Sequence, residues 1–127
     1  MCPDIMTEVS GYQFTSIHGI LKGYCRLSIK DEIYPAIIPD WESTVDGVVY
    51  KNISRMVWSR FDRFEGKLYK RQSVMISLND GSSLESETYV LRPEFINILE
   101  NTAWNFNNFL NTNKEHFISK YRGFSLL

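Results

Sequence analysis

The stretch FDRFEGKLYKR, residues 61–71, contains the change from a helical to a strand pattern that decides the predicted fold. Four apolar residues in and before it are spaced by four, four and three positions, as on one face of a helix. They are Ile53, Val57, Phe61 and Phe64. Asn52 or Ser54 can cap the start of this helix, and Gly66 can supply the left-handed residue that ends it. The next residues, LYKRQSVMISL (68–78), favour a strand.

Glu65 stands at this junction, between Phe64 and Gly66. The carbonyl groups at the end of a helix favour cations, so a carboxylate there is locally unfavourable. Apolar neighbours raise the pKa of a carboxyl group, and a general acid/base works best when its pKa lies near the working pH. Glu65 is therefore the leading catalytic candidate. The alternative is a solvated surface glutamate that pairs with Arg63 or Lys67.

The segments before the junction predict a helix followed by strands. Residues 3–11 favour a helix, and residues 14–29 favour a strand in which Gly19 and Gly23 mark bulges or bends. Pro35 and Pro39 each lack a ladder donor, so residues 34–44 are expected to be extended with turns. Residues 44–52 then form a second strand.

The segments after the junction predict a hairpin followed by helices. NDGS, residues 79–82, is a strong hairpin turn that joins residues 68–78 to a strand at residues 83–91. Pro93 ends that strand. A helical segment is expected around residues 104–110, and a second helix is expected to begin at Thr112. Strands outnumber helices, which predicts an α+β domain whose largely antiparallel sheet closes like a barrel and hides its edges.

Composition narrows the class of protein. The 127 residues include 43% hydrophobic residues, enough for the core of one domain, and 14 Lys+Arg balance 15 Asp+Glu. There is no basic field for nucleic acid and no apolar run of about 20 residues for a membrane span. The first residues lack the features of a signal peptide, so we expect a soluble cytoplasmic protein. Cys2 and Cys25 lack metal or redox spacing, and His18 and His116 lie far apart, so we expect no metal site.

A few other side chains are candidates for a binding site. Tyr34 and Pro35 can line a pocket, although such a pair is more often a packed turn. Arg71 can hold a substrate carboxylate with two hydrogen bonds, or it can face solvent or pair with Glu85 or Glu87. No phosphate loop, nucleophile elbow or Cys/His pair is present in the sequence.

Four short segments, in this order and spacing, resemble the γ-glutamylcyclotransferase-like family. That family includes γ-glutamylamine cyclotransferases and plant proteins induced during avirulence responses. The matching segments are Tyr34-Pro35-Ala36-Ile37, Val45-Asp46-Gly47-Val48-Val49-Tyr50, Phe61-Asp62-Arg63-Phe64-Glu65-Gly66 and Tyr69-Lys70-Arg71. The resemblance extends over nearly the whole chain, and it implies one domain over residues 1–127, a small mixed, mainly antiparallel β-barrel with flanking helices.

The resemblance also implies an activity and a site. Active members cyclise a γ-glutamyl compound to 5-oxoproline and release its amine, which is transferase or lyase chemistry without a cofactor. It assigns the acid/base role to Glu65 and makes Tyr69, Tyr34 and Pro35 pocket residues. Arg71 then orients Tyr69 or meets the substrate carboxylate. The expected partner is a small γ-glutamyl compound, not nucleic acid or a membrane.

One family feature is missing from the sequence. The family opens with an apolar strand and a Tyr-Gly-Ser/Thr-Leu loop whose backbone groups help to hold the substrate, and this chain has no such motif. We therefore expect the domain to be incomplete at its N-terminus. The alternative is a module on the same scaffold that binds a small ligand or a protein without turnover.

Overall fold

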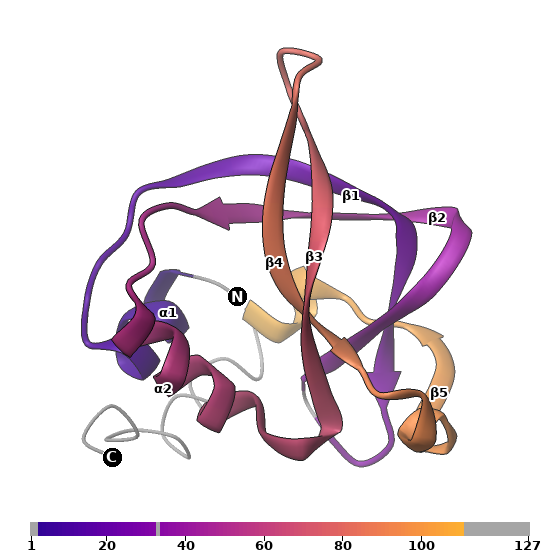
Figure 1. Ribbon diagram of the computed structural model, residues 1–127. Coiled ribbons are helices and arrows are strands. Elements are labelled where there is room, and N and C mark those ends of the chain that lie inside the picture. Colours follow the sequence, from indigo (N-terminus) through magenta and orange to yellow (C-terminus); the bar gives the residue numbers. More distant parts are fainter. Residues whose placement is uncertain (1–2, 33, 111–127) are drawn as a thin grey trace.

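The computed structural model describes residues 3–32 and 34–110 (Figure 1). The helices are α1 (Pro3–Ser10), α2 (Arg55–Glu65) and α3 (Phe106–Asn108), with the 3-10 helices η1 (Gly66–Leu68) and η2 (Pro93–Ile98). The strands are β1 (Ser16–Ile29), β2 (Pro35–Tyr50), β3 (Tyr69–Leu78), β4 (Ser83–Leu91) and β5 (Leu99–Ala103). No helix of the described residues is long and apolar enough to cross a membrane.

The strands form one sheet in the order β2-β1-β3-β4, with β5 paired to β1. The pairings among the described residues are all antiparallel, which confirms the α+β class with a mainly antiparallel sheet. The predicted closed barrel is wrong, because in the described part of the chain no ladder joins β2 to β4. The sheet stays open because β1 pairs with β3 only through Gly19–Leu21 and then curves towards β5 (Figure 1).

Two glycines of β1 have different roles. Gly23 has a φ of 85° and lies at the register shift between Lys22 and Tyr24, so the predicted bulge is confirmed there. Gly19 does not mark a bulge. It lies where β1 is paired on both sides, and a Cβ at Gly19 would clash with Cγ2 of Ile76. The absence of a side chain at Gly19 therefore permits the close approach of β1 and β3.

β2 is a single strand of 16 residues, so the prediction of turns within residues 34–44 is wrong. Pro35 pairs with Ser28 and Pro39 pairs with Tyr24 in a ladder with β1. β2 has β1 as its one ladder neighbour among the residues described. An edge strand tolerates proline because the donor is not needed on the side that faces away from its neighbour.

The helix and hairpin around residues 53–91 agree with the prediction. Ser54 caps α2 by accepting a hydrogen bond from the backbone N–H of Val57 at 3.3 Å, and Gly66 ends the helix with a φ of 73°. The segment after Pro93 differs. η2 and β5 occupy residues 93–103, and β5 pairs with β1 at Leu27 and Ile29. The helical segment predicted around residues 104–110 is present as α3, which continues as a π-helical turn at residues 109–110. The helix predicted from Thr112 lies outside the described residues.

The core has two buried clusters. One joins α1 to α2 and contains Ile5, Met6, Val9, Val57, Phe61 and Phe109. The other lies among the strands and contains Ile29, Ala36, Tyr69 and Leu91. Because α2 packs in the first cluster and β3 begins in the second, the α2–β3 junction lies between them.

Candidate functional site

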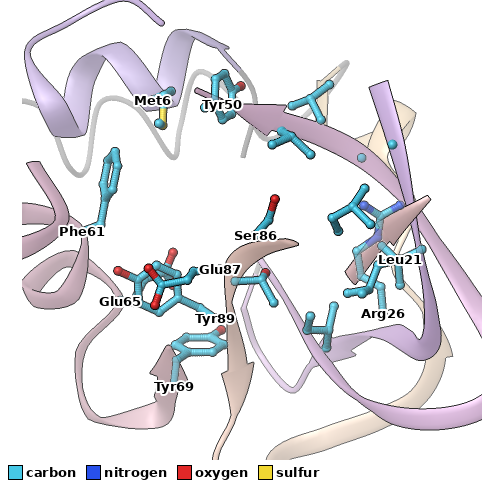
Figure 2. A pocket seen from close by; sticks show the side chains of 18 of the residues that line it. Met6, Leu21, Arg26, Tyr50, Phe61, Glu65, Tyr69, Ser86, Glu87 and Tyr89 are labelled. Carbon is cyan, nitrogen blue, oxygen red and sulfur yellow. The ribbon is translucent and has the colours of Figure 1, made fainter. Parts of the chain in front are cut away.

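A cavity of about 1180 Å³ lies between α2 and the strands. Its lining includes side chains from α1, α2 and strands β1 to β4, and the side chain of Glu65 is part of this lining. Figure 2 shows Glu65, Tyr69 and Tyr89 grouped on one side of the cavity, with Leu21 and Arg26 on the other side. The helix-to-strand junction therefore brings its carboxylate to a hollow in the molecule.

Glu65 is the last residue of α2 and is partly buried. Burial penalises the charged carboxylate and raises the pKa of Glu65 from 4.5 to about 7. Water reaches part of the side chain from the cavity, while the surrounding protein removes most of its bulk hydration. Within the described residues no ion pair joins Glu65 to Arg63 or Lys67. Near neutral pH this group can therefore both accept and donate a proton.

Tyr69, Tyr34 and Pro35 line the same cavity as Glu65. Tyr69 is buried at the start of β3, and its hydroxyl donates a hydrogen bond to the backbone oxygen of Pro35 at 3.0 Å. This bond ties the first residue of β3 to the first residue of β2. The structure thus brings four of the five predicted site residues to one cavity.

Arg71, the fifth, is absent from the lining of this cavity. Its guanidinium group lies over the ring of Trp58, 4.6 Å from the centroid. It also lies 3.5 Å from Asp62 and 3.4 Å from Glu87. The contact with Glu87 is one of the alternatives that the sequence left open for Arg71.

Asp62 and Tyr89 were not among the site residues predicted from the sequence. The Tyr89 hydroxyl donates a hydrogen bond to Oδ1 of Asp62 at 2.6 Å, and Tyr89 lines the cavity. Burial, with a further effect of Asp62, raises the pKa of Tyr89 well above its ordinary value. Asp62 could have been found from its spacing, because it lies one helical turn before Glu65. Tyr89 gives no such signal until the pairing of β3 with β4 is known.

Arg26 provides a cation on the β1 side of the cavity. Its guanidinium group lies 5.1 Å from the centroid of the Trp104 ring, and burial lowers the pKa of Arg26. Over the part of the chain that the structure describes, no group of three His, Cys, Asp or Glu side chains is arranged to hold a metal ion. The polar side chains of the cavity include carboxylates, hydroxyls, an amide and a few cations.

The amino-acid sequence matches a known protein family over most of its length. The family described as "Gamma-glutamyl cyclotransferase, AIG2-like" matches residues 2–106. This chain belongs to that family. The match includes the α2–β3 junction with Glu65, Tyr69 and Arg71 and the start of β2 with Tyr34 and Pro35.

Named relatives come from Arabidopsis thaliana. AIG2-like protein C is 32% identical over 109 residues, which are 85% of this chain and 63% of that protein. AIG2-like protein D is 33% identical over 107 residues, which are 83% of this chain and 70% of that protein. The chain thus spans somewhat less than two thirds of the length of AIG2-like protein C.

Two solution structures of Arabidopsis thaliana proteins have a similar fold. One has a TM-score of 0.71 at 23% identity, and the match covers 95% of this chain and 73% of that protein. The other has a TM-score of 0.67 at 25% identity, and the match covers 94% of this chain and 80% of that protein. These two proteins therefore share the α+β fold of this chain.

Proposed function

We propose that this chain carries the acid/base site of a γ-glutamyl cyclotransferase-like enzyme, which forms 5-oxoproline from a γ-glutamyl compound and releases an amine. The observation that carries the proposal is the carboxyl group of Glu65, which lies in a cavity wall with its pKa raised to about 7. Membership of the γ-glutamyl cyclotransferase, AIG2-like family supports the same chemistry.

The reaction needs one group that moves protons. The α-amino nitrogen of the substrate attacks its own side-chain carbonyl carbon, and a C–N bond forms that closes a five-membered ring. Glu65 takes a proton from that nitrogen. The bond between the carbonyl carbon and the leaving amine then breaks, and Glu65 gives its proton to the leaving nitrogen. No water or cofactor is consumed, and Glu65 returns to its first state.

Proximity explains why one carboxyl group suffices. The attacking amine and the carbonyl belong to the same molecule, and well-oriented intramolecular reactions reach effective molarities on the order of 10⁵ M or more. The protein must fold the substrate and transfer a proton. Tyr69, Tyr34 and Pro35 are the proposed substrate-binding residues, because they line the cavity with Glu65. Arg71 does not line it, so we assign Arg71 an indirect role.

We further propose that an extended N-terminal segment completes the domain. The support comes from strand edges that face the cavity. Beyond Gly19–Leu21, β1 and β3 separate, and both strands line the cavity. Among the described residues, Lys70–Met75 of β3 has no ladder partner on the side away from β4. A strand in this gap would satisfy those backbone groups and reduce a cavity that is large for one γ-glutamyl compound.

The alternative is a binding module without turnover. The observation that favours it is the absence of the Tyr-Gly-Ser/Thr-Leu motif from the sequence. Oriented donors near a developing oxyanion often supply a large part of catalysis, and a site without them would bind a γ-glutamyl compound but not convert it.

Product analysis tests the proposal. The protein, and a version extended by its upstream residues, are incubated with γ-glutamyl amines and γ-glutamyl dipeptides, and 5-oxoproline is measured by mass spectrometry. The variant Glu65→Gln keeps the shape of the side chain but cannot transfer the proton. Glu100→Gln is the matched control, because Glu100 is exposed on β5 and does not line the cavity.

We expect 5-oxoproline from the wild type and from Glu100→Gln, and at least about 100-fold less from Glu65→Gln. Isothermal titration with the same compounds separates the two functions. Binding without product, in the chain with and without its upstream residues, would support the binding module and reject the enzyme.

A further inference from the structure

One face of α2 carries Trp58, Asp62 and Glu65, because four and three residues separate them. The residues Val57 and Phe61 of the same helix are buried in the cluster with α1. The face with Glu65 is turned instead to the β3–β4 hairpin, since both Trp58 and Asp62 contact Tyr89 of β4.

The hairpin presents a matching set of side chains to this face. Arg71 of β3 lies directly opposite Tyr89 of β4 in the antiparallel register. Glu87 is two residues from Tyr89 and therefore points to the same side of the hairpin. Opposite and diagonal neighbours on one face are close enough for long side chains to touch, which is why Arg71 reaches Glu87.

The two sets form what we call the helix–hairpin brace: Trp58, Asp62, Arg71, Glu87 and Tyr89. Asp62 is its central group, because one carboxylate oxygen accepts the Tyr89 hydroxyl at 2.6 Å and the other lies 3.5 Å from Arg71. The Arg71 guanidinium group lies between the carboxylates of Asp62 and Glu87 and over the ring of Trp58. A bond between a neutral hydroxyl and a carboxylate is among the stronger hydrogen bonds in proteins.

We propose that this brace positions Glu65 for proton transfer, so that Asp62, Arg71 and Tyr89 are positioning residues of the cyclotransferase site. The inference rests on the proposed function. Asp62 precedes Glu65 by one helical turn, and α2 ends immediately after Glu65 at the left-handed Gly66. Helix ends fray unless they are held, and the bond from Tyr89 to Asp62 holds this end against the hairpin. A misplacement of about 1 Å can cost about 100-fold in rate.

The brace acts on Glu65 through geometry. The charged and titratable groups of the brace are Asp62 on α2, Arg71 on β3, and Glu87 and Tyr89 on β4. Tyr69 lines the cavity together with Glu87 and Tyr89. The cation of Arg71 already contacts two carboxylates, and neither Arg71 nor Asp62 lines the cavity. If the brace is released, we expect the last turn of α2 to move away from the hairpin and the hydration of Glu65 to increase.

The variant Tyr89→Phe tests this with the smallest change, because it removes one hydroxyl and no charge. Tyr24→Phe is the matched control. The Tyr24 hydroxyl also makes one side-chain hydrogen bond within the sheet, from Gln72, but Tyr24 does not line the cavity. The titration of the Glu65 carboxyl group is followed by NMR in protein labelled with ¹³C-glutamate, with Glu65→Gln to assign its signal. The kcat and KM for 5-oxoproline formation are measured alongside.

We expect Tyr89→Phe to lower the titration midpoint of Glu65 by about one pH unit, because water restores its hydration. We expect kcat to fall by about 10-fold or more, with KM changed less than about 2-fold, because proton transfer and not substrate binding is disturbed. Tyr24→Phe should leave all three values as in the wild type. Arg71→Lys keeps the charge but not the planar fork, and we expect a smaller effect in the same direction.

The proposal is overturned if Tyr89→Phe lowers only the melting temperature and leaves the Glu65 midpoint and kcat as in Tyr24→Phe. A wild type without turnover, whose Glu65 midpoint still falls in Tyr89→Phe, rejects the proposed enzyme but supports the brace. An active wild type whose Glu65 midpoint does not respond to Tyr89→Phe supports the enzyme and overturns the brace. Should Tyr89→Phe fold poorly, Arg71→Lys gives the same comparison.

Discussion

Replacing Glu65 by glutamine should make the protein more stable at alkaline pH, although it removes the proposed catalytic group. Burial raises the pKa of Glu65 from 4.5 to about 7, so the folded protein holds this proton more tightly than the unfolded chain does. The stabilisation from that proton is complete below pH 4.5 and is lost as the pH rises through about 7. The whole effect is at most about 3 kcal/mol, because the side chain keeps some contact with water. Glutamine does not titrate and avoids this loss.

The effect is measured as a difference between variants. Urea unfolding of the wild type, Glu65→Gln and the exposed control Glu100→Gln is followed by tryptophan fluorescence at about pH 5 and about pH 8. Between these values the wild type should lose about 2 kcal/mol relative to Glu65→Gln. In a domain of this size the same difference corresponds to a melting temperature about 8 °C higher for Glu65→Gln at the alkaline pH.

Glu100→Gln should follow the wild type at both values, because Glu100 is exposed. The reasoning is refuted if Glu65→Gln and the wild type change in parallel between the two pH values. That result would mean that Glu65 is as well hydrated in the folded protein as in the unfolded chain.

Three further substitutions test the elements that hold the site. Gly66→Ala should lower the free energy of unfolding in urea by about 1 kcal/mol, because Gly66 has a φ of 73°. Gly47→Ala is the control, because the φ of Gly47 is not positive and a Cβ there meets nothing within 4 Å. It should lower the free energy of unfolding by less than half as much. Ser54→Ala should lower the free energy of unfolding by about 1 kcal/mol, because it removes the cap of α2. An unchanged free energy of unfolding would contradict the capping role. Gly19→Ala should lower the free energy of unfolding by about 1–3 kcal/mol, because its Cβ would clash with Ile76. Adding Ile76→Ala to Gly19→Ala should make the loss caused by Gly19→Ala smaller.

Much of the local structure could be predicted from the sequence, because the signals lie within a few residues. The spacing of Ile53 to Phe64, the cap at Ser54 and the stop at Gly66 define α2, and the Asp80-Gly81 turn defines the hairpin. Glu65 was found as a candidate because its charge is unfavourable at a helix end.

The errors arose where distant segments decide the outcome. Pro35 and Pro39 predicted turns, but β2 is an edge strand in which a missing donor has no cost. The five residues of β5 carry no alternating pattern and become a strand only because β1 curves to meet them. The sequence left several partners open for Arg71, and its position was decided by Asp62 and Glu87, because no sequence spacing shows that α2 packs on the hairpin.

The prolines of β2 also bear on how the protein behaves at high concentration. A long strand with an unpaired edge can recruit strands from neighbouring molecules and start aggregation. β2 has 16 residues, and within the described part of the chain its side away from β1 has no ladder partner. Pro35 and Pro39 interrupt the row of donors on this strand, and Asp40 and Glu42 add like charges that repel another copy. We expect that replacing both prolines by valine would promote fibril formation, which thioflavin fluorescence would detect.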